Sequence, residues 1–192
     1  MDAFIDYIHL ADNVDLSKEL KSICEEYLSK CHTTKKYQGE RTTFFDNQFI
    51  NDTRLIKLYD FIVEESLVYL DVIGVDRLSV SPSITALWFS NVGSNGNHQY
   101  HSHSPGSHLS GTFYIDIEPD SSPIIFLSRF FYNDIWIDLP YKEKNMYSAS
   151  TIQIPSKNGR LLLWKSDMIH GVVNNQTDTR NTCSFNITFF RK

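Results

Sequence analysis

The segment that decides the fold lies near the end of the chain, where residues 182–190 read Thr-Cys-Ser-Phe-Asn-Ile-Thr-Phe-Phe. Polar and apolar side chains alternate along it, and successive side chains of a β-strand point to opposite faces of the sheet. The segment is therefore predicted to be a strand with one buried face. Similar short runs, rich in β-branched and aromatic residues, recur after Pro82 between turn residues. They predict further strands over residues 85–92, 110–117, 123–127, 151–154, 160–164 and 169–173.

Two amphipathic helices are expected before these strands. In residues 15–31 the apolar side chains recur at steps of three and four, which places them on one face of a helix. A second helix is expected over residues 52–72, with Asp52 or Thr53 as its N-cap. Its predicted buried side carries Leu55, Leu58, Phe61, Ile62 and Leu70. Residues 32–50 are polar and are expected as a loop or short irregular strands.

This order of elements predicts a fold that is mainly β with N-terminal helices. Seven or eight strands after two helices suggest a double-stranded β-helix, also called a jelly-roll, with helices packed outside one sheet. We therefore expect residues 1–82 to form an N-terminal helical region that packs on the barrel, and residues 83–192 to form the double-stranded β-helix core.

Composition excludes several classes of protein. The chain has 192 residues, about the size of one domain, and its 23 acidic against 18 basic residues give a formal charge of −5. A nucleic-acid partner bound through a broad basic surface is therefore not expected. No apolar run reaches the 18 residues of a membrane span. The acidic N-terminus and three cysteines without C-x-x-C spacing lead us to expect a reduced, cytoplasmic protein.

Histidines are unevenly distributed, and four of the seven, His98, His101, His103 and His108, fall within eleven residues. In a strand-like segment His101 and His103 point to the same side, so that both imidazoles can converge on one metal ion. A strand-turn-strand is predicted before His170. It would bring His170 back to the mouth of the barrel, where this histidine could be a third ligand. His98 and His108 are expected as loop residues at the rim.

Arg180 begins the last predicted strand, ten residues after His170, and Thr182 lies on the same face of that strand. A guanidinium group binds a carboxylate through two parallel hydrogen bonds, and a nearby hydroxyl adds a further donor. The pair therefore suits the anchoring of a small carboxylate.

The order H-x-H, distant His and Arg resembles that of the 2-oxoglutarate/Fe(II)-dependent oxygenases. The segment His101-Ser-His-Ser-Pro-Gly-Ser-His-Leu-Ser-Gly-Thr-Phe-Tyr114 is similar to an H-x-H-p-g-s-x-x-S-G-x-Y-Y signature of a subfamily found in bacteria and marine phages. That subfamily's later pattern, G-x-L-x-x-F, H-G-V and R-x-x-x-S-F-N, is matched over residues 159–186, with Trp164 at the position of Phe. The resemblance covers about residues 85–190.

The resemblance implies an Fe(II)- and 2-oxoglutarate-dependent oxygenase that uses O2, oxidises an unknown substrate, as a hydroxylase would, and releases succinate and CO2. It implies that His101, His103 and His170 are the metal ligands and catalytic residues. It also implies that the far carboxylate of 2-oxoglutarate lies against Arg180. Thr182, Tyr114 and Ser184 would then supply hydroxyl groups to it.

Position 103 departs from the superfamily pattern H-x-D/E, because it holds His where a carboxylate ligand is usual. Either His103 is a third nitrogen ligand, or water, chloride or 2-oxoglutarate completes the coordination shell of the metal.

Two other classes of function stay open. A cupin-type metal-dependent oxygenase or isomerase also uses H-x-H, but cupins place a Glu where this chain has Ser107 or His108. A catalytically inactive β-barrel that binds zinc or no metal is the other.

The substrate is expected to be a small molecule or a protein side chain. Trp88, Tyr114, Phe126, Trp164 and Phe185 form a candidate aromatic wall for the cavity. The segment that contains Arg129, Tyr132, Asn133 and Trp136 is a candidate lid or substrate loop. If the source is viral, the expected location is the host cytoplasm.

Overall fold

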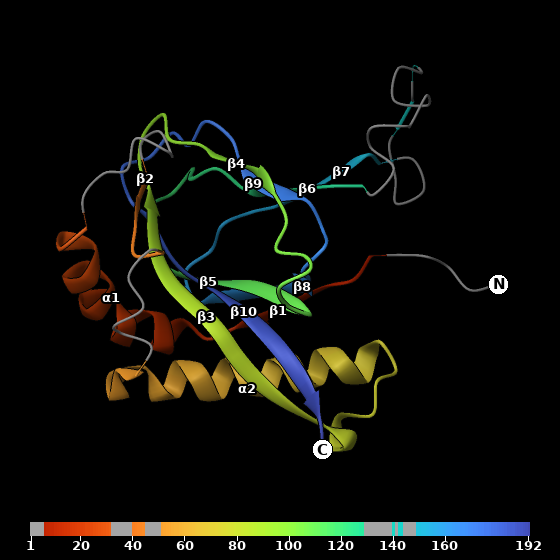
Figure 1. Ribbon diagram of the computed structural model, residues 1–192. Helices are drawn as coiled ribbons and strands as arrows, with labels where there is room; N and C mark the ends of the chain where they lie inside the picture. The colour runs from red at the N-terminus through yellow and green to blue at the C-terminus, as the bar shows by residue number, and fades with distance from the viewer. Residues whose placement is uncertain (1–5, 32–39, 45–50, 129–139, 141, 144–148) are drawn as a thin grey trace.

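The computed structural model describes residues 6–31, 40–44, 51–128, 140, 142–143 and 149–192 (Figure 1). Its strands form two antiparallel sheets, a six-stranded sheet in the order β1-β8-β5-β10-β3-β2 and a four-stranded sheet in the order β4-β9-β6-β7. Two facing antiparallel sheets preceded by helices confirm the expected fold class. The strands are β1 (Ile8–Asp12), β2 (Glu40–Thr42), β3 (Val80–Val92), β4 (His98–His101), β5 (Leu109–Ile117), β6 (Ile124–Leu127), β7 (Thr151–Ile154), β8 (Arg160–Lys165), β9 (His170–Val172) and β10 (Arg180–Arg191).

Strand β10 lies inside the six-stranded sheet, between β5 and β3. One row of its alternating side chains, Cys183, Phe185 and Ile187, is fully buried in the core that the sheet shares with the helices. Arg180, Thr182 and Ser184 belong to the other row and line a pocket on the opposite face of the sheet. The alternation in the sequence therefore separates a structural face from a face that lines this pocket.

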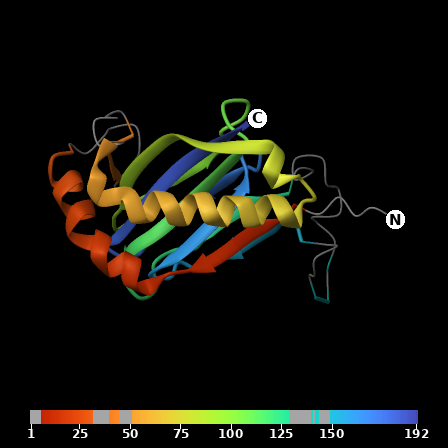
Figure 2. The same cartoon turned by 90° about the horizontal axis from the view of Figure 1, so that it is seen from below.

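Both helices pack on the outer face of the six-stranded sheet. Helix α1 spans Val14–Ser29, and α2 spans Ile56–Val72 after the 3₁₀ turn η2 (Thr53–Leu55). Figure 2 shows the sheet from the helix side, with α2 running across the strands. Apolar side chains of both helices and of strands β3, β5, β8 and β10 form one buried cluster. Among its members are Leu20, Cys24, Leu58, Ile62, Phe89, Phe113, Leu161 and Phe185.

The observed helices agree with the expected ones to within a few residues. The Asp52 side chain accepts a hydrogen bond from the Arg54 backbone N–H, so it caps η2 ahead of α2. Of the predicted buried residues, Leu55, Leu58, Ile62 and Leu70 are buried, and Phe61 packs partly buried against the same cluster. Tyr69, which was not predicted, is also buried.

Two short strands, β1 and β4, were missed, and β2 falls in the stretch that was expected as a loop or short irregular strands. Strands β1 and β2 lie at the two edges of the six-stranded sheet, where they pair with β8 and β3, and β4 lies at an edge of the other sheet. Each has three to five residues and pairs with a strand at least 45 residues away in the sequence. Such segments are too short to show a clear period. The division of the chain at residue 82 stays a prediction.

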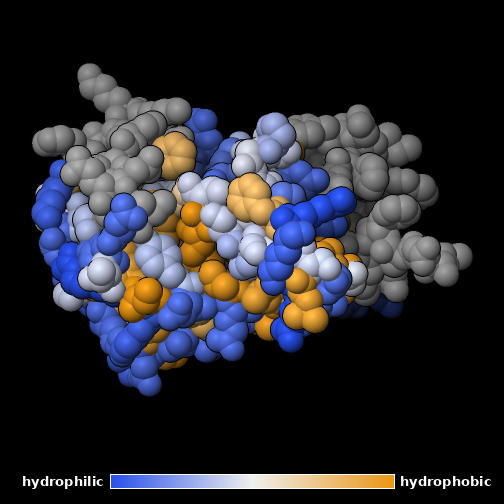
Figure 3. All heavy atoms as spheres, turned by 60° about the horizontal axis from the view of Figure 1, so that its bottom comes forward, coloured by the Kyte–Doolittle hydropathy of each residue, from blue (hydrophilic) through white to orange (hydrophobic). Residues whose placement is uncertain are grey.

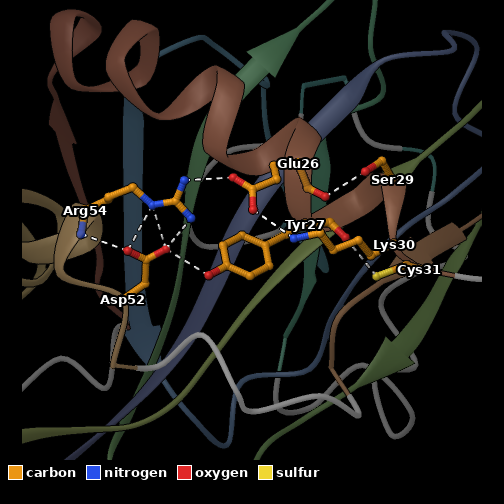
Figure 4. Close-up of polar contacts among 7 residues, drawn as sticks. All are labelled: Glu26, Tyr27, Ser29, Lys30, Cys31, Asp52 and Arg54. Atoms are coloured by element: carbon orange, nitrogen blue, oxygen red, sulfur yellow. Dashed lines mark hydrogen bonds and ion pairs between the residues drawn. The ribbon is translucent and has the colours of Figure 1, made fainter.

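A network of charged side chains links the end of α1 to the start of α2 (Figure 4). Arg54 Nη1 lies 2.7 Å from Glu26 Oε2, Arg54 Nη2 lies 2.6 Å from Asp52 Oδ2, and Tyr27 donates its hydroxyl hydrogen to Asp52 Oδ2 at 2.8 Å. Hydrogen bonds from Arg54 and Lys30 lower the pKa of Glu26 to about 2. The ion pair between Arg54 and Glu26 is exposed, so it contributes little to the stability of the fold.

Helix α2 and the turn that follows it also keep apolar side chains on the solvent side. The face shown in Figure 3 carries hydrophobic residues among hydrophilic ones. The exposed apolar residues of this region are Ile56, Val68, Val72, Ile73, Val75 and Leu78. None of the helices in the described part of the chain combines the length and the apolar character needed to cross a bilayer.

At Gly111 of β5, neighbouring atoms of the core leave no room for a side chain. A Cβ atom at this position would lie 2.4 Å from Phe185 Cζ and 2.6 Å from the backbone carbonyl oxygen of Leu162. Because the carbonyl cannot move without breaking the sheet, we expect Gly111→Ala to destabilise the fold by about 1–3 kcal/mol in urea unfolding. Gly106→Ala is the control, since its Cβ would meet its nearest neighbour at 3.4 Å. Equal stability of the two variants would contradict this packing.

Candidate metal centre

Two strands of the smaller sheet bring together histidines that are 69 positions apart in the sequence. His101 ends β4 and His170 begins β9, and these two residues are direct partners in the antiparallel register. Their ring centroids are 4.4 Å apart. Side chains of directly opposed residues point to the same face of a sheet, so the pairing aims both imidazoles at one point.

His103 joins the pair from just beyond the end of β4. Its backbone N–H donates to the carbonyl oxygen of Ser166 at 2.8 Å, which holds the segment against the turn that leads to His170. The His103 ring lies 4.9 Å from that of His101 and 5.3 Å from that of His170. One nitrogen from each of the three rings lies within 4.8 Å of the others. The three predicted ligands therefore converge.

Backbone carbonyls fix the tautomers of two of these rings. His101 Nδ1 lies 2.8 Å from the carbonyl oxygen of Gln99, and His170 Nδ1 lies 3.0 Å from that of Met168. Because a carbonyl oxygen only accepts hydrogen bonds, each Nδ1 carries the proton and each Nε2 keeps its lone pair. Metal-binding histidines are oriented in this way in other proteins.

Burial keeps the three imidazoles neutral. Loss of solvent lowers the pKa of His101 and of His103, the latter to about 4, and lowers the pKa of His170 well below its ordinary value. Neighbouring histidines lower each value further. A metal ion needs a ring nitrogen that carries no proton. Each neutral imidazole offers one such nitrogen at neutral pH. Three neutral nitrogen donors fit a divalent transition metal such as Fe(II).

Arg180 and the histidines line one pocket. The guanidinium is 4% exposed; its Nε donates to the Ser122 carbonyl at 3.1 Å and its Nη2 to the Tyr114 hydroxyl at 3.4 Å. Within the part of the chain that the structure describes, no carboxylate forms an ion pair with it. A buried cation without an anion is costly. The pocket is therefore suited to receive an anion.

The other predicted cosubstrate residues lie around Arg180. Thr182 and Ser184 line the pocket. Tyr114 is fully buried behind the guanidinium, whose Cζ lies 5.3 Å from the centroid of the Tyr114 ring. Tyr114 therefore contacts Arg180 and is not among the pocket-lining residues.

Of the predicted aromatic wall, Trp88 and Trp164 line the pocket. The Trp164 side chain is 2% exposed, and its indole Nε1 has no hydrogen-bond partner among the described residues. Phe126 is buried 5.8 Å from the His170 ring, and Phe185 packs on the helix side of the sheet.

The expectation for His98 is wrong, and a neighbour of it was missed. His98 lies in strand β4, not in a loop, and its Nδ1 is 2.9 Å from the Oε2 of the buried Glu40. Glu40 stands alone in a polar stretch, so nothing in the sequence marked it.

His108 is exposed, and its Nδ1 accepts a hydrogen bond from the Phe189 backbone N–H at 3.2 Å. The candidate lid residues Arg129, Tyr132, Asn133 and Trp136 lie outside the described residues.

Comparison with protein families gives one match. A family described as "Putative 2OG-Fe(II) oxygenase" matches residues 86–186, which is more than half of the chain and contains every histidine of the cluster. A search of curated proteins found no match.

Solved structures share the fold at low sequence identity. A Pseudomonas putida prolyl-4-hydroxylase is 10% identical, with a TM-score of 0.63 over 97% of this chain and 94% of that chain. HygX from Streptomyces hygroscopicus, solved with nickel and 2-oxoglutarate, is 9% identical, with a TM-score of 0.61 over 95% and 83%. A Trichoplax adhaerens prolyl hydroxylase, solved with a peptide fragment of hypoxia inducible factor, is 16% identical, with a TM-score of 0.58 over 93% and 82%.

The lowered histidine pKa values predict how the stability of the metal-free protein depends on pH. An unfolded histidine titrates near pH 6.5, so between there and about pH 4 the unfolded chain binds more protons than the folded chain. The free energy of unfolding should therefore fall as the pH is lowered from 7 to 5. Urea unfolding of the wild type and of His103→Asn measures this slope, which should be shallower in the variant. His108→Asn is the control, and equal slopes for all three proteins would contradict the prediction.

Proposed function

The chain belongs to the 2OG-Fe(II) oxygenase family, and we propose that His101, His103 and His170 hold its iron while Arg180 anchors 2-oxoglutarate. The observation that carries this proposal is the convergence of three neutral imidazoles in one pocket with a buried guanidinium that forms no ion pair among the described residues. Bound Fe(II) supplies the activation of O2 that couples the conversion of 2-oxoglutarate to succinate and CO2 with oxidation of the substrate.

The contribution of the protein is to orient ligands and to exclude water. The carbonyls of Gln99 and Met168 hold the lone pairs of His101 and His170 toward the metal position. A third imidazole at His103 takes the place of the usual carboxylate and matches the other two in donor atom and in charge. The apolar faces of Trp88 and Trp164 line the pocket and limit access of solvent.

The anionic cosubstrate would be held by polar groups of the pocket wall. Arg180 offers a buried positive charge, and Thr182 and Ser184 offer hydroxyl groups. Tyr114 would act indirectly, because its hydroxyl accepts from Arg180 and holds the guanidinium in place. Charge-assisted bonds of this kind are about twice as strong as neutral ones.

The substrate is proposed to be a small molecule or an amino-acid side chain of a protein. The Trichoplax adhaerens neighbour was solved with a peptide, so the fold admits a peptide in that protein. The net charge of −5 argues against a nucleic acid held by a basic surface. A cytoplasmic location, in a bacterium or in the host of a phage, belongs to the same proposal.

Anaerobic reconstitution with Fe(II) and 2-oxoglutarate tests the proposed site. We expect one iron per chain, a visible charge-transfer band that needs both components, and succinate release when O2 is admitted. His101→Ala and His170→Ala should each abolish the band. Tight zinc binding without a band or succinate would contradict the proposal and favour an inactive metal-binding barrel.

The arginine assignment predicts a selective loss of cosubstrate affinity. Arg180→Gln should raise the Kd for 2-oxoglutarate roughly thirtyfold or more, the equivalent of about 2 kcal/mol, because a buried charged bond is lost. Stability to urea should change little, because the variant removes a buried charge that forms no ion pair with a carboxylate of the described residues. Arg160→Gln, which removes an arginine bound to Asp12 outside the pocket, is the control. An unchanged Kd in Arg180→Gln would show that another group binds the cosubstrate.

Two substitutions at one position test whether His103 is a ligand. His103→Ala should weaken Fe(II) binding at least roughly tenfold, since one of three nitrogen donors is lost. His103→Asp should restore binding, because it supplies the carboxylate of the H-x-D pattern. Iron titration under anaerobic conditions measures both, with His108→Ala as the control. Wild-type affinity in His103→Ala would mean that two histidines and an exogenous ligand hold the metal.

A further inference from the structure

Glu40 is a buried acid beside the proposed iron site. It lies on the three-residue edge strand β2, opposite Val92 of β3, and Val92 lines the pocket. The side chain is 1% exposed. Its Oε1 is buried and has no hydrogen-bond partner among the described residues, while Oε2 lies 2.9 Å from His98 Nδ1. A carboxylate buried with one oxygen unused is costly unless a positive charge compensates it.

His98 connects this carboxylate to the candidate ligands. It lies at the start of β4 and lines the same pocket, and its ring centroid is 4.6 Å from that of His101. No nitrogen of His98 belongs to the group of three converging ligand atoms, and neither does an oxygen of Glu40. Both residues therefore lie next to the ligand set and outside it.

The charges in the pocket suggest what Glu40 does. The three ligands are neutral imidazoles, whereas the family's usual set includes one carboxylate. With Fe(II) and the dianion 2-oxoglutarate bound, the two charges of the metal are balanced by the cosubstrate, and the charge of Arg180 is left over. Glu40 carries the one negative charge that would make the loaded pocket neutral. Burial lowers the pKa of Arg180, and the charge of Glu40 opposes that shift, so its field reaches the guanidinium.

We propose that Glu40 is a positioning residue that replaces the missing ligand carboxylate as a source of negative charge, acting through His98 from outside the ligand set. The inference rests on the proposed function, because it assumes that a divalent metal binds the three histidines. Partners of metal ligands commonly change metal affinity by tenfold to a hundredfold.

Binding of Co²⁺ and then of 2-oxoglutarate to the full chain tests this role without turnover. Glu40→Gln should lower Co²⁺ affinity at least roughly tenfold in a competition titration. The affinity of the Co²⁺-loaded protein for 2-oxoglutarate should not fall, because removal of a negative charge favours an anion. A loss of Co²⁺ affinity without a loss of 2-oxoglutarate affinity distinguishes a charge effect from a loss of structure, which would weaken both.

Glu65→Gln is the matched control. Glu65 of α2 also pairs with a histidine, at 2.6 Å from His9 Nε2, but on the helix side of the six-stranded sheet. Its substitution removes the same charge and should leave both affinities unchanged. If Glu40→Gln fails to fold, Glu40→Asp and Glu40→Asn replace it as a pair of variants with side chains of equal shape. Glu40→Asn, which lacks the charge, should then bind Co²⁺ more weakly than Glu40→Asp, with no loss of 2-oxoglutarate affinity.

The possible results separate the two proposals. If the wild type binds no Co²⁺, or if His101→Ala binds it equally well, the proposed iron site is wrong. If the wild type binds and Glu40→Gln binds with the same affinity, or loses both ligands together, the role of Glu40 is overturned while the iron site stands. A combination with His98→Asn should be less than additive. Strict additivity would overturn the part played by His98.

Discussion

The antiparallel pairing of β4 with β9 is the contact on which the candidate site depends. It places His101 directly opposite His170, and the turn before β9 provides both the Met168 carbonyl that orients His170 and the Ser166 carbonyl that holds His103. The smaller sheet faces the side of the larger sheet that is turned away from the helices (Figure 1). The strands therefore fix the position of the site, while its chemistry comes from residues at the strand ends.

Burial has several linked consequences in this pocket. It keeps the imidazoles neutral and thus ready to bind a metal, and it makes the charge of the Arg180 guanidinium costly. It also makes unused polar atoms costly, and the two buried side-chain atoms without a partner in the described chain, Glu40 Oε1 and Trp164 Nε1, both belong to this region. Binding of charged ligands in this pocket would lower the free-energy cost of these buried polar groups.

Regular patterns made most of the fold predictable. The three- and four-residue spacing located both helices, and the alternation in β10 separated Phe185 on the core side from Thr182 on the pocket side. Edge strands β1 and β4 were missed, because their hydrogen-bond partners lie far away in the sequence. His98 was misjudged for the same reason, since the strand that contains it forms only through its pairing with β9.

The sequence by itself determined the elements, the order H-x-H, His and Arg, and through them the family. Local spacing and side-chain type encode these features, because a strand or helix periodicity needs no distant partner. Only the tertiary structure decided that Glu40 lies against His98, that Tyr114 contacts Arg180, and that Trp164 lines the pocket. These relations depend on burial and on contacts across sheets, and neither quantity is a property of a single stretch of chain.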